Sequence, residues 1–537
     1  TQNVVITKSS TALLFGSCQI GNVNTPTVQF PATNVSSLQV RSTASPGNLT
    51  IKAGSTLDLS SMLLNRQAAG GAFSMEAGST LRLSGTTGGQ TGSNFPLNYT
   101  TSSPALNANS TVEYYASSNQ TIYDVVSPGY GNLSLTGAAT QSTSTALDIQ
   151  GALTIGSGAT FSAGTSLTHN IGGDWTNNGT FSYTTGSTIN FNGSSNQAVG
   201  GTVVTSFNNL TNANASTGLT LGYGILVNGT LSMSGATANI DLNGYNIDLS
   251  SAGRITGESN IDRIYGASGS ITTTRTLNAP SAINVGGMGL ILTSASNLGS
   301  TTITRQHTDL TNGDFSSLTR NYQISPTNNS GLNATITFNY FDNELNGLST
   351  QENDFSLWRS TDGGSTWTQR NGTITSASNY ISLASIDAFS LWTVGPSSGV
   401  VLSSKIIDFN VSKKENKVAL KWVATNEQET EYYEVEASFD GIHFHPLSSI
   451  DVKKNHVNSN TYLLFDDNYV NGVNYYRLKS IDYDGSEDYT KTISIDITKY
   501  KTDLVMTVNS LGQRIDNNYS GVVFDIYSDG SSIKRIQ

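Results

Sequence analysis

The chain has 537 residues, of which 12% are charged and 53 are glycine, and its formal net charge is −11. A negative chain repels phosphate backbones, so the charge excludes a nucleic-acid-binding protein. Few charges together with abundant Gly, Ser, Thr and Asn are typical of short strands joined by tight turns, so we predict an all-β protein.

The first residues of the chain, TQNVVITKSS, do not show the charged start and following apolar stretch of a signal peptide. We therefore expect that a signal peptide has been removed before this point. No apolar run approaches the roughly 18 residues that span a bilayer, so we predict no transmembrane segment. The single cysteine, Cys18, excludes an internal disulfide, and we expect it to be a small buried residue.

Residues 1–265 contain an internal repeat. The segment from Ser110, STVEYYASSNQTIYDVV, aligns with the segment from Ser187, STINFNGSSNQAVGGTVV, at an offset of 77 residues. Apolar and polar residues alternate within each copy, which indicates strands with one face turned inward. Such strands stack as rungs of a β-solenoid or form sandwiches, and we favour a solenoid resembling a parallel β-helix, with roughly 12 rungs.

The segment THNIGGDWTNNGTFSYTTGSTINFNGSSNQ, which begins at Thr168, also resembles the repeat units of Bacteroidetes surface β-helix proteins. The resemblance covers residues 40–250. It implies an extracellular rod whose rungs stack Asn, Thr and Ser side chains in ladders.

The solenoid segment lacks the clustered carboxylates and basic residue that catalysis by a polysaccharide lyase would need. A polysaccharide lyase needs carboxylates that bind calcium and a basic residue that takes a proton. Asp124, Asp148 and Asp174 lie far apart in the sequence, and no Lys or Arg occurs between Arg82 and Arg254. We interpret the closer pair in IDLNGYNIDL as a solvated turn pair; it consists of Asp241 and Asp248. We predict no catalytic residue.

Two further groups in the solenoid carry structural or binding hypotheses. Three arginines at its end are expected to cap an open last rung and block edge pairing: Arg254, Arg263 and Arg275. Four tyrosines offer flat rings to glycans, or else belong to the core: Tyr114, Tyr115, Tyr123 and Tyr130.

Residues 266–397 have longer and more aromatic strands, which predict a β-sandwich with Trp358, Trp367 and Trp392 available to its core. The sequence STDGGSTW, Ser360 to Trp367, resembles the Asp-box of sialidase-like propellers. We interpret it as a fold element in which Asp362 caps a hairpin turn and Trp367 packs beneath.

Residues 398–498 follow a linker, Pro396-Ser397-Ser398-Gly399, and resemble a fibronectin type III or immunoglobulin-like domain with Trp422 in its core. We interpret His443 and His445 as an ordinary exposed pair on one side of a strand, because a metal site needs further ligands. The acidic runs at Asp466-Asp467 and in IDYDGSED from Ile481 leave calcium as the one cofactor to consider.

Residues 499–537 look like a sorting tail. The LGQR turn, the GVVFDIY strand and the basic residues Lys534 and Arg535 near the end resemble the C-terminal signals of Bacteroidetes proteins exported by the type IX secretion system. The resemblance implies a set of signal positions: Leu511, Gly512, Gln513, Gly521, Val522, Asp529, Gly530, Lys534 and Arg535. It also implies the secretion translocon and its outer-membrane shuttle as partners, and an extracellular or cell-surface location.

These observations favour a non-enzymatic, extracellular structural or adhesive protein exported by type IX secretion. Its surface of Ser, Thr, Asn and Tyr suits weak multivalent contact with glycans. A second hypothesis is a subunit of an extracellular filament, joined by solenoid stacking or strand exchange. A third is a secreted carbohydrate-active enzyme or glycan-binding protein.

Overall fold

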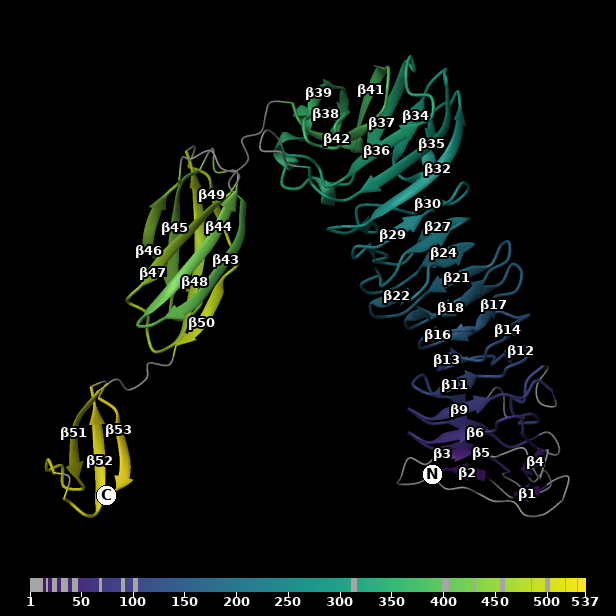
Figure 1. Ribbon diagram of the computed structural model, residues 1–537, viewed down its shortest axis with the longest axis horizontal. Helices are drawn as coiled ribbons and strands as arrows, with labels where there is room; N and C mark the ends of the chain where they lie inside the picture. The colour runs from purple at the N-terminus through teal and green to yellow at the C-terminus, as the bar shows by residue number, and fades with distance from the viewer. Residues whose placement is uncertain are drawn as a thin grey trace. The chain divides into compact units, whose positions relative to one another are not determined.

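Figure 1 shows the computed structural model of the chain. It describes residues 13–15, 18–21, 27–29, 37–40, 47–66, 70–87, 92–99, 105–310, 316–397, 405–425, 427, 430–453, 459–483, 485–497, 503–516, 518–528 and 530–537. The described residues form β-strands with a few short 3₁₀ helices, which confirms the all-β prediction. The chain divides into two compact units, Thr1–Asn312 with Ser316–Ser398, and Gly399–Gln537 with Gly313–Phe315.

The first unit begins as a parallel β-solenoid, as the alternating pattern predicts, with about ten turns in place of the roughly 12 rungs expected. Most turns contribute a strand to each of three faces in succession (Figure 1). The first face is one continuous sheet of eleven strands: β3 Thr27–Gln29, β6 Thr56–Asp58, β9 Thr80–Leu83, β11 Thr111–Tyr114, β13 Asn132–Leu135, β16 Leu153–Ile155, β19 Trp175–Asn177, β22 Gln197–Gly201, β25 Leu219–Leu221, β28 Ile240–Asp241 and β31 Ile264–Tyr265.

The other two faces are interrupted along the rod. The second comprises β1 Leu13–Phe15, β4 Ser37–Val40, β7 Leu63–Arg66, β12 Gln120–Thr121, β14 Thr140–Ser142, β17 Thr160–Ser162, β20 Thr180–Ser182, β23 Thr205–Phe207, β26 Ile225–Val227, β29 Asn246–Asp248 and β32 Ser270–Asn278. The third comprises β2 Cys18–Ile20, β5 Leu49–Ile51, β8 Phe73–Met75, β10 Ala105–Leu106, β15 Asp148–Ile149, β18 Thr168–Ile171, β21 Thr188–Phe191, β24 Asn209–Asn212, β27 Thr230–Met233 and β30 Arg254–Thr256.

Stacked apolar side chains fill the solenoid. Along the first face one register column joins buried residues of successive rungs: Leu57, Leu81, Val112, Leu133, Leu153, Trp175, Val199 and Leu221. Each such side chain stabilises the fold by roughly 1.5–3 kcal/mol. Cys18 packs against this core, and burial raises the pKa of its thiol to about 11.

The internal repeat has a physical basis in two buried glutamines. Gln120 and Gln197, which the 77-residue offset superimposes, make equivalent hydrogen bonds. Each side-chain amide donates to two main-chain carbonyls of an earlier turn and accepts from the N–H four residues before it. The copies nevertheless lie on different faces, because β12 belongs to the second face and β22 to the first. The repeat therefore preserves a local rung geometry and not a position around the rod.

The last rungs of the solenoid continue into two antiparallel sheets. The strand β32 pairs in parallel with β29 and antiparallel with β35. The first sheet continues through β35 Asn297–Gln306, β36 Asn321–Pro326, β42 Leu391–Pro396, β38 Phe355–Ser360 and β39 Thr368–Asn371. The second contains β33 Ile283–Asn284, β34 Leu290–Thr293, β37 Ala334–Asn339, β41 Tyr380–Ile386 and β40 Thr373–Thr375. The described 3₁₀ helices belong to this region: η1 Val285–Gly287, η2 Asp342–Glu344, η3 Ser349–Asp354 and η4 Ser376–Ser378.

One hydrophobic core runs from the solenoid into these sheets, where it includes the fully buried Trp392. This continuity corrects the expectation of an open last rung capped by arginines, because the core runs on into the sandwich and the second face continues from β32 to β35. The three arginines have other roles. Arg263 donates to the Asn343 carbonyl at 3.0 Å, Arg275 donates to the Gly253 carbonyl, and Arg254 is exposed.

A buried charge cluster fastens the loop after β30 to the sandwich sheets. The Arg305 guanidinium binds Glu258 through two hydrogen bonds of 2.6 and 2.8 Å. Arg320 binds Glu344 at 2.9 Å, and these four side chains are at most 7% exposed. His307 lies 3.4 Å from Glu344, but burial lowers the pKa of His307 to about 4. The imidazole is therefore neutral at pH 7, and its contact with Glu344 is a hydrogen bond and not an ion pair.

The second unit contains two sheets that share a core around Trp422, which is fully buried as predicted. One sheet has the order β43 Lys405–Lys414, β44 Lys417–Thr425 and β47 Asn460–Asp466. The other has the order β46 His445–Asp451, β45 Thr430–Ser438 and β48 Gly472–Asp482, with β49 Glu487–Tyr489 and β50 Ile493–Ile497 both on β48. The chain ends in a three-stranded sheet of β51 Leu504–Asn509, β52 Val522–Tyr527 and β53 Ser532–Ile536.

Candidate functional sites

The solenoid carboxylates are engaged with the main chain of their own turns or of the next rung. Asp241 accepts a hydrogen bond from the N–H of Asn243 at 2.9 Å, and Asp248 accepts one from the N–H of Ser250 at 2.7 Å. The two residues lie on different faces, in β28 and β29. Asp174 accepts a hydrogen bond from Ala198 N–H at 2.7 Å. These carboxylates are turn-forming groups and do not converge on a shared site.

For two of the four tyrosines the core alternative is confirmed. Tyr114 and Tyr130 are fully buried, and their hydroxyls are 3.0 Å apart inside the solenoid. Tyr123 is partly buried and stacks on Phe95 with ring centroids 4.6 Å apart. The Tyr115 hydroxyl donates to Asp58 at 2.6 Å. Tyr114 and Tyr130 therefore offer no ring face to a glycan.

The Asp-box hairpin forms as the sequence predicts. Asp362 accepts hydrogen bonds from the Thr366 N–H at 2.9 Å and the Thr366 hydroxyl at 2.6 Å, across the turn between β38 and β39. Gly363 and Gly364 have φ of 74° and 97°, which side chains disfavour. These hydrogen bonds, with one from Ser360, lower the pKa of Asp362 to about 2. The hairpin is thus a structural element.

The histidine pair of the second unit is only half as predicted. His443 lies in the turn before β46 and His445 in its first position, so the two do not share a strand face. Both are exposed, in agreement with the prediction. The His443 Nδ1 atom makes a hydrogen bond of 2.7 Å with the Asp440 carboxylate. The ring centroids of His445 and Phe439 are 5.5 Å apart.

The acidic runs of the second unit have protein partners. Asp466 accepts a hydrogen bond from the Tyr476 hydroxyl at 2.8 Å, and Asp467 pairs with Lys417 at 3.0 Å. Asp482, from the second run, accepts one from the Thr430 hydroxyl at 2.9 Å. Asp484 lies outside the described residues. Across the residues that the structure describes, no three His, Cys, Asp or Glu side chains gather in a way that could hold a metal ion.

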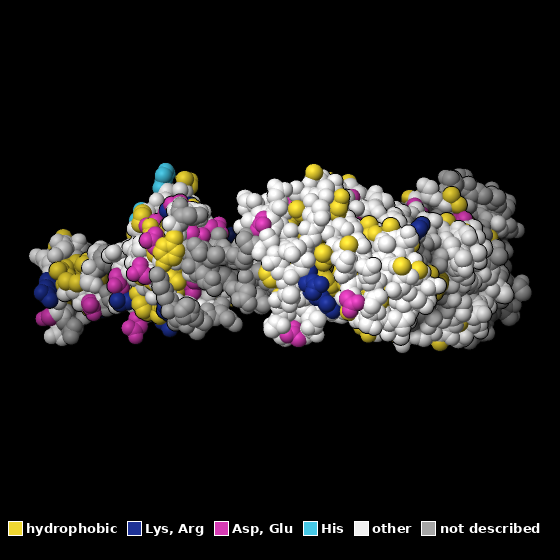
Figure 2. Space-filling model, turned by 90° about the horizontal axis from the view of Figure 1, so that it is seen from above, with side chains coloured by type: hydrophobic (Ala, Val, Ile, Leu, Met, Phe, Trp, Pro, Cys, Tyr) yellow, Lys and Arg dark blue, Asp and Glu magenta, His cyan; other side chains and the backbone are white. Residues whose placement is uncertain are grey.

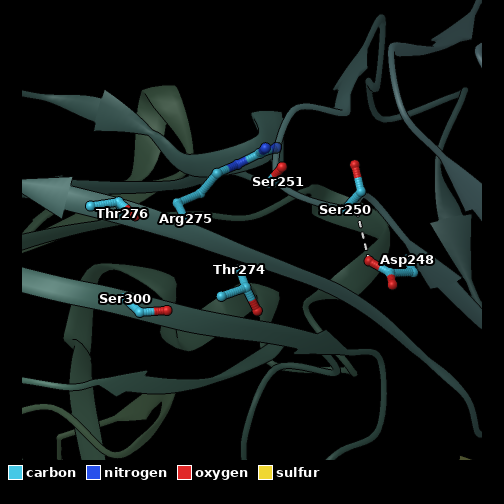
Figure 3. Close-up of a pocket in the computed structure, with 7 residues that line it drawn as sticks. All are labelled: Asp248, Ser250, Ser251, Thr274, Arg275, Thr276 and Ser300. Carbon is cyan, nitrogen blue, oxygen red and sulfur yellow. Dashed lines mark hydrogen bonds between the residues drawn. The ribbon is translucent and has the colours of Figure 1, made fainter.

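A polar groove of about 380 Å³ lies where the second face of the solenoid meets the hairpin of β32 and β35 (Figure 3). Seven residues line it: Asp248, Ser250, Ser251, Thr274, Arg275, Thr276 and Ser300. They supply five hydroxyl groups, one carboxylate and one guanidinium, and no apolar side chain longer than a methyl group. Sequence patterns indicate other roles for Asp248 and Arg275, which lie 27 positions apart, and only the fold brings the two together.

Local contacts fix the groove. The hydroxyl of Thr274 lies 2.9 Å from that of Thr302 on the neighbouring strand β35. Burial lowers the pKa of Arg275 below its ordinary value of 12.5, yet a guanidinium stays charged at pH 7. Among the described residues, Arg275 has no carboxylate within ion-pair distance, whereas Arg82 of the same unit has two and Arg305 and Arg320 have one each. The Arg275 guanidinium therefore has no carboxylate in direct contact among the described residues, and Asp248 of the same groove acts on it only over a longer distance.

The sequence-predicted signal positions lie on the turns and strands of the terminal sheet. Leu511, Gly512 and Gln513 form the turn after β51, where Leu511 is 80% exposed. Gly521 and Gly530 have positive φ, and Val522 begins β52. Lys534 and Arg535 lie in β53, where Arg535 binds Asp525 at 2.6 Å. Asp529 lies outside the described residues.

One face of the terminal sheet is apolar. Paired residues in an antiparallel sheet point to the same side. Phe524 pairs with Val508 and Lys534, and Ile526 pairs with Met506, so these apolar side chains share a face. The other face holds Asp525 with its partners. Val523 is the buried apolar residue among the described positions of β51, β52 and β53.

The two units have different surfaces. Residues 1–250 carry 13 charged side chains and residues 401–537 carry 35. Figure 2 shows the consequence, because the visible face of the first unit is largely uncharged while basic and acidic side chains crowd the second. Within the described ranges, no helix is long and apolar enough to cross a membrane.

The chain matches no protein-family model and no curated protein sequence. Among solved structures it matches the crystal structure of a beta-1,2-glucanase from Parabacteroides distasonis at 15% sequence identity. The match covers 43% of this chain and 37% of that one, with a TM-score of 0.13. A similarity this low carries no argument about activity.

Proposed function

We propose that the protein is a non-enzymatic structural and adhesive protein of the cell exterior, exported by the type IX secretion system. The solenoid and its sandwich form the displayed rod, and residues 499–537 form the sorting tail. The translocon and its outer-membrane shuttle are the partners that this proposal implies.

The observation that carries the proposal is the construction of the terminal sheet. Its three strands bury little apolar surface, while Met506, Leu511 and Ile536 are 36%, 80% and 82% exposed. Small sheets need a partner for their apolar face, because a sheet of this size gains little stability from its own core. We infer that this face, with the signal positions around it, docks on the secretion machinery.

We further propose that residues 398–498 are a fibronectin type III or immunoglobulin-like domain that separates the rod from the tail. The strand order supports this, with β43, β44 and β47 in one sheet and β46, β45, β48 and β50 in the other. Such domains occur as spacers in many surface proteins.

The test expresses the full chain, behind a secretory leader, in a host with type IX secretion. Removal of residues 499–537 is expected to leave the protein in the periplasm, whereas the intact chain is labelled on whole cells by an antibody. A variant of the preceding domain, Glu415→Ala, keeps the tail and is the matched control. Equal surface labelling of the tailless chain would contradict the proposal.

Unpaired strand edges at one end of the rod support the filament hypothesis. Among the described residues, β1, β2 and β3 each pair with a single neighbour, so the first rung offers strand edges. At the other end β32 continues into the sandwich by pairing with β35, while β30 and β31 are the last strands of the third and first faces. Repeated rung stacking needs two open ends, and the sandwich and its shared core occupy this one, so stacking alone joins at most two copies. An extended filament then requires strand exchange between neighbours.

A further inference from the structure

We propose that the groove between β29, β32 and β35 binds saccharides that carry a carboxylate, such as chains of uronic acids. The inference rests on the proposed adhesive function for its biological meaning, and it adds the ligand class and the binding residues. It requires no covalent step.

The groove has the size and lining of a sugar site. Its volume of about 380 Å³ lies in the lower part of the range for ligand pockets, about 300–1,000 Å³. Five hydroxyl-bearing residues line it, namely Ser250, Ser251, Thr274, Thr276 and Ser300 (Figure 3). Hydroxyls both donate and accept hydrogen bonds, as sugar hydroxyls require.

Arg275 gives the groove its preference for acid. One of its terminal nitrogens donates to the Gly253 carbonyl, which holds the guanidinium in place. No hydrogen bond from its other nitrogens is found among the described residues, nor an ion pair. A guanidinium fork matches a carboxylate in shape and charge, and charge-assisted hydrogen bonds are roughly twice as strong as neutral ones.

Asp248 supplies the complementary acceptor. Its Oδ1 atom accepts the Ser250 N–H, and its Oδ2 atom has no hydrogen-bond partner in the described part of the chain. A carboxylate of this kind accepts hydrogen bonds from sugar hydroxyls. Because it would repel the ligand carboxylate, the acid group of the sugar is expected at Arg275 and the neutral hydroxyls at Asp248.

Strand pairing holds the groove in advance of binding. The side chains of Thr274 and Ser300 project from β32 and β35, whose residues pair one to one from Ile271↔Arg305 to Leu277↔Gly299. The Thr273 hydroxyl also donates to the Ser250 carbonyl at 2.7 Å, which ties the solenoid turn to β32. Pre-organised groups lose little conformational entropy when they bind.

The test measures binding of tetragalacturonate to the purified full-length protein by calorimetry, with neutral galactotetraose as the comparison. Arg275→Gln is expected to weaken tetragalacturonate binding about tenfold, because one charge-assisted contact contributes about 1.4 kcal/mol. Arg254→Gln is the matched control, since Arg254 is an exposed arginine of the same end of the rod that does not line the groove. It is expected to bind like the parent protein.

A second variant guards against misfolding of the first. Ser300→Glu adds a carboxylate at an exposed position of the groove, and it should abolish binding of the acidic sugar. Equal binding of the acidic and neutral sugars, unchanged binding by Arg275→Gln, or no binding of tetragalacturonate at 10 mM would each overturn the inference. Because the purified protein is tested, these results do not depend on the tail or on export.

Discussion

The two units of the chain reach stability by different means. The first unit has a charge-poor surface and one core that runs from the solenoid into the sandwich, with a buried charge cluster at the junction. The second has a smaller core around Trp422, many surface charges and a terminal sheet with an exposed apolar face. The first unit thus gains its stability from one continuous core, whereas the second leaves apolar side chains of its terminal sheet exposed.

The largest expected effect is the loss of stability when the buried tryptophan at the centre of either unit is replaced. Trp175→Ala and Trp422→Ala each remove a fully buried ring, which destabilises the surrounding unit by about 3–5 kcal/mol. Because the chain divides into two compact units, each variant should lower only one of two calorimetric transitions. A single transition that shifts in both variants would show that the units unfold together.

The next effect concerns the buried charge cluster. Arg320→Met leaves Glu344 as a buried carboxylate without its main cation, which is expected to destabilise the first unit by about 3 kcal/mol. The double variant Arg320→Met with Glu344→Leu removes both charges and should recover much of the loss. Thermal unfolding measures both. A double variant no more stable than Arg320→Met would contradict this account of the buried charge cluster.

A pH effect distinguishes the units through His307. Its folded-state pKa is lowered to about 4 by burial, so the unfolded chain binds a proton first as the pH falls below the ordinary value of 6.5. Stability of the first unit is therefore present above pH 6.5 and is lost progressively as the pH falls to 4. The groups that face the imidazole are Glu344, Arg305 and Arg320.

The measurement follows the first thermal transition between pH 7 and 4 in the parent protein and in His307→Gln. The variant should flatten the pH dependence in this window. A parent protein whose first transition stays constant from pH 7 to 4 would contradict the burial of a neutral histidine.

The smallest effect is local to the Asp-box hairpin. Asp362→Ala removes the acceptor of the two Thr366 hydrogen bonds at an exposed turn. We expect faster amide hydrogen exchange at Gly364 and Thr366, with a change of about 1 kcal/mol or less in global stability. Asp387→Ala, in the same sandwich, is the comparison variant. Unchanged exchange in Asp362→Ala would mean that the carboxylate does not hold the turn.

Much of the fold was open to prediction because it depends on local patterns. Alternation indicated the solenoid rungs, and aromatic alternation identified Trp392 and Trp422 as core residues. The same rule places Tyr114 inside, since it follows buried Val112 by two positions.

The remaining features depend on contacts between distant segments. Arg305 lies two residues after buried Ile303 and so points inward, but its partner Glu258 is 47 residues away. Its pairing could not be inferred from periodicity. The groove is similar, because Ser and Thr are too common in this chain to mark a site until β32 and β35 bring seven particular residues together. The continuation of the rod into the sandwich also needed strand pairing that the sequence does not state.

The central claim is that the tail delivers the rod to the cell exterior, and protease accessibility on intact cells tests it most directly. The full chain is expressed in a type IX-proficient host and in the same host without the translocon. The account predicts that external protease removes the rod only in the proficient cells, while the protein in translocon-deficient cells stays protected. Equal digestion in both hosts would contradict it.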